Sequence, residues 1–229
     1  MRVEPFADRH EAGRALGEEL AHRYGGRDDL VVLALPRGGV PVGYHVAEAL
    51  GAPLDVFLVR KLGVPGHEEL AMGAIATGGV RVVNDQVLRH VPVSPSMIEA
   101  VAERERRELE RRERAYRGSR PPVDVRGRTV IVVDDGLATG STMRAAVRAL
   151  RKMEPAAVIV AVPVAAARTC EELRSEADDL VCLRTPEPFD AVGLWYRDFA
   201  QTTDEEVHEL LDRKHVVGGG WRSTGSADF

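Results

Sequence analysis

Cysteine is scarce in this chain of 229 residues, which has only Cys170 and Cys182. The two form no C-x-x-C pair, so the sequence signals neither a disulfide framework nor a zinc site. Long apolar runs are also missing. No stretch approaches the roughly twenty apolar residues of a membrane-spanning helix, and the amino-terminal segment has no apolar signal-peptide core. We therefore expect a cytoplasmic protein without a membrane partner.

An excess of positive charge is absent as well. The formal net charge is -5 and the sequence pI is about 5.8, so the chain as a whole does not attract polyanions, and we expect no nucleic-acid partner. The seven histidines are scattered without metal-ligand spacing, and no G-x-S-x-G motif is present. Metallohydrolase and serine-hydrolase functions therefore lack support.

Short apolar runs bounded by glycine, proline or charge predict buried strands. Helix-period segments lie between several of them, and strands that alternate with helices are typical of a doubly wound α/β fold with a mostly parallel, here five-stranded, sheet and flanking helices. The predicted strands are Leu30 to Leu35, Leu54 to Val59, Val130 to Val133, Ala156 to Val164 and Leu180 to Leu183. The predicted helices are Arg9 to Tyr24, Val42 to Leu50, Thr142 to Arg151 and Thr169 to Glu176.

Two stretches break this alternation. Residues 72–84 hold two short β-prone runs around Gly78-Gly79, which predicts a hairpin. Residues 96–117 predict a long helix, with Ser96 as N-cap and Glu99 completing a capping box. Its charges of both signs at i,i+3 and i,i+4 spacing favour a solvated, ion-paired face over nucleic-acid binding. The hairpin and the helix could also form a dimer interface, and we expect a homodimer.

The segment from Thr129 to Leu150 carries the strongest functional signal. A predicted strand is followed by two acids, a loop of small residues and a helix. A loop at a helix N-terminus offers free backbone N–H groups and the positive end of the helix dipole, which together bind phosphate. Glycine allows close approach and the hydroxyls add donors. The predicted phosphate-binding residues are Ala138, Thr139, Gly140, Ser141 and Thr142.

The two acids are Asp134 and Asp135. Carboxylates repel a phosphate, so their place beside a phosphate loop needs a reason. Because a carboxylate only accepts hydrogen bonds, the pair suits the vicinal hydroxyls of a ribose whose 5-phosphate lies in the loop. A helix cap with acidic residues near the dipole is the alternative. It accounts for one acid and one hydroxyl residue, but not for the whole run.

The run VVDDGLATGSTM, residues 132–143, resembles the 5-phosphoribosyl-1-diphosphate (PRPP) motif of type I phosphoribosyltransferases, most closely the form in adenine and uracil enzymes. The loop lacks the lysine of a Walker A sequence. The resemblance extends over residues 30–200 and implies the type I phosphoribosyltransferase fold with a small hood. The enzymes for 6-oxopurines have an acid where this sequence has Ala138, which argues against a hypoxanthine or guanine substrate.

The run Leu35-Pro36-Arg37-Gly38-Gly39 lies where the family has its pyrophosphate loop. The resemblance implies that Arg37 and the backbone N–H groups of Gly38 and Gly39 bind the diphosphate. It also makes Pro36-Arg37 a candidate cis peptide bond. Without the PRPP motif, a Gly-Gly turn before a helix is a weak signal.

Arg60 and Lys61 resemble the basic pair that leads into the flexible catalytic loop of adenine-type enzymes. The resemblance implies that Arg60 acts in catalysis and that Lys61 binds the departing pyrophosphate; a solvated strand end is the alternative. His67, Glu68 and Glu69 follow in the expected lid, and Glu69 is our candidate among them.

The run Pro188 to Tyr196 resembles the base-binding hood of 6-oxopurine enzymes, although its F-to-G spacing is one residue longer. Phe189 and Trp195 are candidates to stack on an aromatic acceptor. Packing against the carboxy-terminal helix explains them equally well.

The resemblance implies one phosphoribosyltransferase-like domain over residues 1–217, with an insert at about 72–120 and a hood built from the amino-terminal and 185–217 segments. Residues 218–229 are expected to be disordered. The implied enzyme is a pentosyltransferase that uses PRPP, an acceptor base and Mg²⁺, with the ion held on PRPP near Asp134 and Asp135. A PRPP-sensing regulator and a sugar-phosphate hydrolase remain alternatives.

Overall fold

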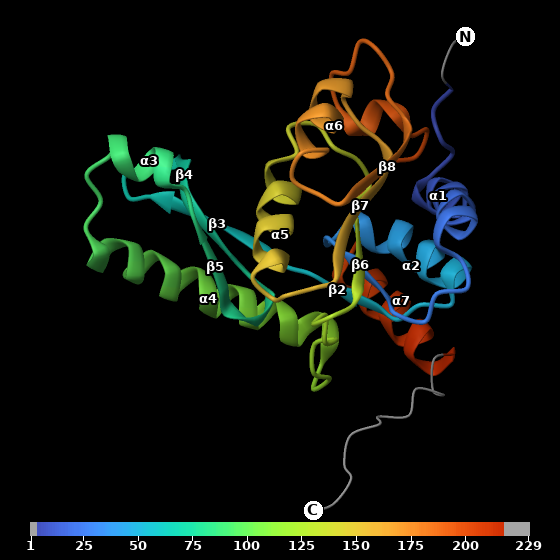
Figure 1. The fold of residues 1–229 in the computed structure, drawn as a ribbon, viewed down its shortest axis with the longest axis horizontal. Helices are drawn as coiled ribbons and strands as arrows, with labels where there is room; N and C mark the ends of the chain where they lie inside the picture. The colour runs from blue at the N-terminus through green and yellow to red at the C-terminus, as the bar shows by residue number, and fades with distance from the viewer. Residues whose placement is uncertain (1–3, 218–229) are drawn as a thin grey trace, which may run out of the picture.

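Five parallel strands form the central sheet of the computed structural model, which describes residues 4–217 (Figure 1). The strand order is β2-β1-β6-β7-β8. This arrangement confirms the predicted doubly wound, five-stranded α/β fold. The strands are β1 (Leu30–Ala34), β2 (Leu54–Val56), β6 (Thr129–Val133), β7 (Ala157–Val164) and β8 (Asp179–Arg184).

Helices cover both faces of this sheet. The apolar core on one face includes residues of α1 (Arg9–Tyr24), α2 (Gly39–Leu50) and α7 (Asp204–Val217), and the core on the other face includes residues of α5 (Ser141–Arg151) and α6 (Ala167–Leu173). Successive residues of a strand point to opposite faces: Val32 packs in the first core and Leu33 in the second. No helix in residues 4–217 is long and apolar enough to cross a bilayer.

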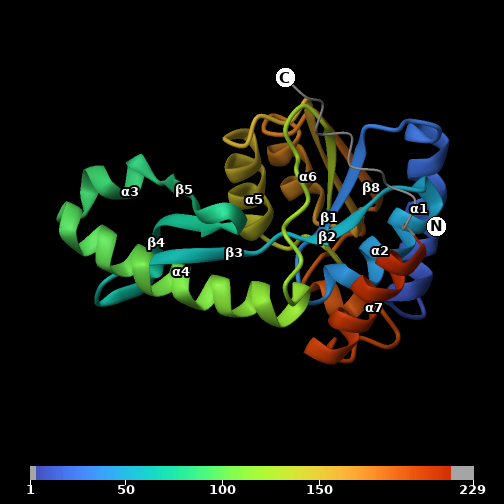
Figure 2. The same ribbon diagram turned by 90° about the horizontal axis from the view of Figure 1, so that it is seen from below.

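An antiparallel sheet and a long helix project from this core as an arm (Figure 2). The predicted hairpin is present as the pairing of β4 with β5. The arm comprises β3 (Val59–Val64), β4 (His67–Ala76), the 3-10 turn η1 (Thr77–Gly79), β5 (Val80–Val83), α3 (Asp85–His90) and α4 (Pro95–Arg117). The hood contains a second 3-10 turn, η2 (Val192–Trp195).

The prediction of the second strand, Leu54 to Val59, was wrong about the residue at which the strand ends. The chain leaves the central sheet after Val56. Leu58 is already held by the arm, because its N–H donates to Thr77 Oγ1 at 2.9 Å and its C=O accepts from the Thr77 N–H at 2.9 Å. The apolar run alone does not reveal this division, because both parts are buried.

The predicted N-cap of the long helix was also wrong. Ser94, not Ser96, caps α4, since its Oγ accepts from the Met97 N–H at 3.2 Å and Pro95 occupies the first turn. Proline is preorganised for this position. Glu99 pairs with Arg81 of β5 instead of completing a capping box.

A buried ion pair ties the arm to the core. Arg117, at the end of α4, donates from Nε to Asp55 Oδ1 of β2 at 2.7 Å, and the two side chains are only 6% and 4% exposed. Asp55 also accepts from the backbone N–H groups of Val56 and Val123. The carboxylate therefore joins α4, β2 and the segment before β6.

Replacing this carboxylate should weaken the fold. We expect Asp55→Ala to lower the free energy of unfolding by about 3 kcal/mol, because it leaves a buried guanidinium and two backbone donors without their acceptor. Urea denaturation measures the change. Arg126→Ala is the matched control, since it breaks an exposed ion pair with Glu154 and should unfold at nearly the wild-type urea concentration. Equal losses in the two variants would contradict the role of Asp55.

Candidate functional site

The candidate site lies where β1 and β6 end side by side. Ala34 is in register with Val133, and the next N–H, that of Leu35, donates to Val133 C=O at 2.8 Å. The loop after β1 opens α2 at Gly39, and the loop after β6 opens α5 at Ser141. Two helix N-termini thus begin beside the same sheet edge, which favours anionic ligands there.

The loop between β6 and α5 has the geometry of a phosphate cradle. Gly140 has a φ of 67°, in the left-handed region that glycine tolerates. The first hydrogen bond of α5 runs from Arg144 N–H to Gly140 C=O, so the earlier N–H groups precede the helical hydrogen-bond ladder. Among the described residues, no hydrogen bond outside a helix or strand uses the N–H of Ala138, Thr139 or Gly140.

Helix α6 packs against this loop through Thr169. Thr169 Oγ1 donates to Ala138 C=O at 2.5 Å, and a Cβ on Gly140 would lie 2.7 Å from Thr169 Cγ2. The hydroxyls of Thr139 and Ser141 lie 3.1 Å apart on the exposed side. Thr169 was not among the predicted site residues. Its helix was predicted, but the contact with the loop depends on how α6 packs.

Asp134 and Asp135 follow β6 directly and are partly buried. Asp134 Oδ1 accepts from the Asp135 N–H at 2.9 Å. Burial, and then the neighbouring Asp135 carboxylate, raise the pKa of Asp134. Burial also raises the pKa of Asp135, and the Arg9 guanidinium opposes that rise. The surroundings of Asp134 and Asp135 therefore disfavour the ionised forms of these acids.

Arg9, the first residue of α1, reaches this acid pair. Its Nε donates to Asp135 Oδ2 at 2.8 Å, its Nη1 donates to Ala200 C=O at 2.7 Å, and its guanidinium lies 3.9 Å from the centroid of the Phe199 ring. The Tyr196 hydroxyl donates to the backbone C=O of Asp135 at 2.6 Å. The sequence offered no signal for Arg9, which is 126 positions from its partner.

The loop after β1 packs against the same acids. The Pro36-Arg37 peptide is cis, as predicted. A Cβ on Gly38 would lie 2.0 Å from Asp135 Oδ2, and one on Gly39 would lie 2.9 Å from Asp134 Cα. Only residues without a side chain allow this approach. The predicted phosphate loop, acid pair and glycine loop therefore come together at one place.

Arg37 extends from this loop toward helix α7. Its Nη1 lies 3.6 Å from Asp204 Oδ1, which also accepts from the Tyr116 hydroxyl at 2.9 Å. Asp204 was not predicted as a site residue. An acid in the first turn of a helix is common, so its place in the sequence does not distinguish it.

Three other predicted residues lie on the arm. Arg60 Nη2 pairs with Glu105 Oε2 of α4 at 2.6 Å, and Lys61 Nζ lies 3.3 Å from Glu69 Oε2. Among the described residues, no hydrogen bond or ion pair joins these three to Asp134 or Asp135. The expected lid begins here as a β-hairpin of β3 and β4. The roles of Arg60, Lys61 and Glu69 stay predictions.

The hood joins the amino-terminal segment to residues 189–197. Phe6 pairs with the segment after η2: its N–H donates to Trp195 C=O at 2.9 Å and its C=O accepts from the Arg197 N–H at 2.8 Å. Phe189 and Trp195 lie nearly parallel, with ring centroids 6.5 Å apart, and pack against Phe6 and Tyr196. Leu194 and Phe199 are the more exposed apolar side chains of this region. Base binding by Phe189 and Trp195 stays a prediction.

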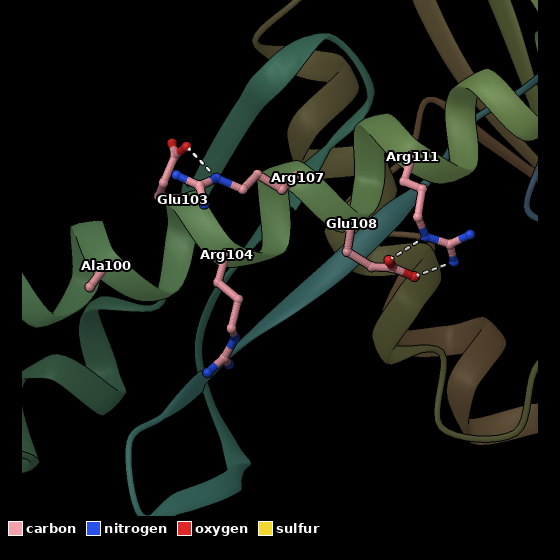
Figure 3. Close-up of a pocket in the computed structure, with 6 residues that line it drawn as sticks. All are labelled: Ala100, Glu103, Arg104, Arg107, Glu108 and Arg111. Carbon is pink, nitrogen blue, oxygen red and sulfur yellow. Dashed lines mark hydrogen bonds and ion pairs between the residues drawn. The ribbon is translucent and has the colours of Figure 1, made fainter.

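The outward face of α4 carries a shallow groove outside the acid site (Figure 3). Its arginines pair with glutamates of the same helix, as in Arg107 with Glu103 and Arg111 with Glu108. This mutual pairing agrees with the solvated, ion-paired face predicted for the helix. Within residues 4–217, no group of three or more His, Cys, Asp or Glu side chains is placed to hold a metal ion.

Comparisons with known proteins show the family of this chain. The family model described as "Phosphoribosyl transferase domain" matches residues 8–196. Two Mycobacterium tuberculosis proteins provisionally named phosphoribosyl transferases, MT0597 and Rv0571c, are each 47% identical over 92% of this chain. The chain spans 47% of their length. The crystal structure of TT1426 from Thermus thermophilus is 45% identical, with a TM-score of 0.81 over 90% of this chain and 97% of that one.

Gly38 offers a test of the packing against Asp135. Its φ of -59° and ψ of -31° are helical, so alanine would ordinarily stabilise the protein by about 0.4–1 kcal/mol. We expect Gly38→Ala to destabilise it by about 1–3 kcal/mol instead, because the new Cβ overlaps the carboxylate. Urea denaturation measures the sign. Stability equal to or above that of the wild type would show that the contact is looser than described.

Proposed function

We propose, since the chain belongs to the phosphoribosyl transferase domain family, that it transfers the 5-phosphoribosyl group of PRPP to a nitrogenous acceptor and releases pyrophosphate. One observation carries the proposal. The free N–H groups of the loop after β6 and the acid pair lie beside the glycine loop after β1. A single ligand with a phosphate, a ribose and a diphosphate suits these three parts.

Each part has a function in binding. The N–H groups and hydroxyls of residues 138–142 would hold the 5-phosphate at the start of α5. Asp134 and Asp135 would accept hydrogen bonds from the ribose hydroxyls. The backbone N–H of Gly38, with the Arg37 guanidinium, would bind the diphosphate, whereas the predicted role of the Gly39 N–H was wrong, because this group already donates to Leu35 C=O at 3.1 Å. Arg37 lies near Asp204, so binding would exchange a carboxylate for a phosphate as its partner.

The chemistry follows from holding the sugar and the leaving group. The bond from C1 of the ribose to the diphosphate oxygen breaks, a bond from C1 to the acceptor nitrogen forms with inversion, and the proton on that nitrogen is released. The transition state resembles an oxocarbenium ion, as in glycoside hydrolysis. Rigid binding of the ribose and neutralisation of the departing pyrophosphate both lower the barrier.

Magnesium suits this site as an ion bound to PRPP. The protein offers two adjacent carboxylates and no larger ligand group within the described residues, and Mg²⁺ in such sites keeps several waters and binds mainly to substrate phosphates. The ion would supply positive charge to the leaving pyrophosphate. Asp134 and Asp135 would lie near the hydrated ion without serving as its ligands.

Residues of the arm would complete the site. We assign Arg60 and Glu69 to catalysis and Lys61 to the pyrophosphate, which requires the β3–β4 hairpin to fold over bound PRPP and exclude water. Arg60 would then exchange Glu105, its partner in this structure, for the diphosphate. Phe189 and Trp195 would bind an aromatic acceptor from the hood side.

The direct test is incubation with PRPP, Mg²⁺ and a panel of purine and pyrimidine bases, with pyrophosphate as the measured product. Release that depends on one acceptor supports the transferase. Release without any acceptor indicates a hydrolase, and PRPP binding without turnover indicates a regulator. Failure to bind PRPP at all would refute the proposal.

Asp135→Asn tests the ribose-binding role. The amide keeps the shape but loses the charge and one acceptor, so we expect PRPP to bind at least about tenfold more weakly. Calorimetry gives the Kd, and urea denaturation gives the stability. The loss of binding should far exceed the loss of folding free energy. Asp198→Asn, at an exposed hood residue, is the matched control; a structural role for Asp135 would instead produce proportionate losses in both measurements.

A further inference from the structure

Arg9 connects three parts of the site that are distant in sequence. It extends from the start of α1, binds the Asp135 carboxylate and the Ala200 carbonyl, and lies over the Phe199 ring. Its side chain is only 11% exposed. A guanidinium presents its donors in a rigid fork and stacks on aromatic faces, so these contacts fix its position as a group.

We propose that Arg9 is a positioning residue for the ribose: it holds the Asp135 carboxylate in place and in a hydrogen-bond-accepting form for a hydroxyl of PRPP. This inference rests on the proposed function. The ion pair engages Oδ2, which leaves Oδ1 as the acceptor for the sugar. Arg9 thus acts through Asp135 and need not touch the substrate.

The surroundings of Asp135 explain why a cation is needed. Asp134 lies at the same strand end, where burial and then the Asp135 charge raise the pKa of Asp134. Tyr196, from the hood, donates its hydroxyl to the Asp135 backbone carbonyl and not to the carboxylate. Burial raises the pKa of Asp135, whereas the hydrogen bond and charge of Arg9 lower it. Arg9 is therefore the group that favours the ionised acid.

A purely structural role for Arg9 is the main alternative, because it also secures the hood. Arg184 supplies a matched comparison. Its guanidinium lies 3.6 Å from the centroid of the Phe6 ring, and it donates to Glu4 C=O, so it also secures the hood through an aromatic ring and a carbonyl. Its hydrogen bond goes to Glu4 and not to Asp135. A loss of PRPP affinity on replacement of either arginine indicates a structural effect on the hood. A loss of PRPP affinity on replacement of Arg9 alone indicates an effect on the Asp135 carboxylate.

The experiment compares the wild type with Arg9→Met, Arg9→Lys and Arg184→Met. Calorimetry gives the Kd for PRPP with Mg²⁺ between pH 5.5 and 8.5. We expect Arg9→Met to bind about tenfold more weakly at neutral pH, and Arg9→Lys, which keeps the charge, to recover part of that loss. The ionised, hydrogen-bond-accepting form of Asp135 exists above its pKa, and removal of Arg9 raises that pKa. As the pH is lowered, Arg9→Met should therefore lose affinity for PRPP at a higher pH than the wild type does.

A second measurement separates this inference from the proposed function. Carbon-13 NMR of the aspartate carboxyl groups, without PRPP, gives the titration midpoint of Asp135 in each variant. A higher midpoint in Arg9→Met than in Arg184→Met shows that Arg9 keeps Asp135 ionised, whether or not PRPP binds; failure of the wild type to bind PRPP would refute the proposed function and, with it, the role in ribose binding. Equal midpoints, or the same loss of PRPP affinity in Arg9→Met and Arg184→Met with an unchanged pH profile, would overturn the inference.

Discussion

The candidate site is constrained by two adjacent carboxylates, Asp134 and Asp135, which lie together in a partly buried place at the end of β6. Burial favours the protonated form of both acids, and the Asp135 charge adds to this effect at Asp134; a protonated acid is a poorer hydrogen-bond acceptor. One guanidinium, that of Arg9, lies against the pair and opposes this tendency. The amino-terminal helix, which carries Arg9, therefore affects the ionisation of Asp135 in addition to packing in the core.

The rest of the site is arranged around that pair by close backbone contact. Gly38 and Gly39 allow the loop after β1 to reach the two acids, and Gly140 allows the loop after β6 to lie against α6. A side chain at Gly38 or Gly39 would collide with the segment that carries the acids, and one at Gly140 would collide with Thr169 of α6. Parallel pairing of β1 with β6 then places both loops at one edge of the sheet. Each loop opens a helix, so two helix N-termini begin at this edge, where the helix dipoles favour negative charge.

The arm has a different relation to the core. It is joined by the buried pair of Arg117 and Asp55 and by the bonds between Leu58 and Thr77. Its exposed hairpin carries Lys61 and Glu69, paired with each other, and Arg60 is held by Glu105. The Lys61–Glu69 pair is exposed and contributes little to stability, whereas Glu105, the partner of Arg60, is only 11% exposed.

The sequence by itself determined the local parts of this protein. Buried strands, the phosphate loop, the acid pair and the glycine loop are each encoded within a few consecutive residues, and a short run of backbone has few ways to present N–H groups and carboxylates. Even so, the apolar run continues past Val56, where the strand ends, and the capping-box spacing of Ser96 and Glu99 favoured Ser96 over Ser94, the observed cap of α4.

Only the tertiary structure decided what meets these local parts. Arg9, Thr169 and Asp204 reach the site from helices whose sequences resemble any amphipathic or capped helix, and their partners are fixed by how those helices pack. The same holds for Arg60, which pairs with a glutamate 45 positions away. Contacts of this length depend on the packing of whole elements, because the periodicity of a helix specifies which face is buried but not which neighbour that face will meet.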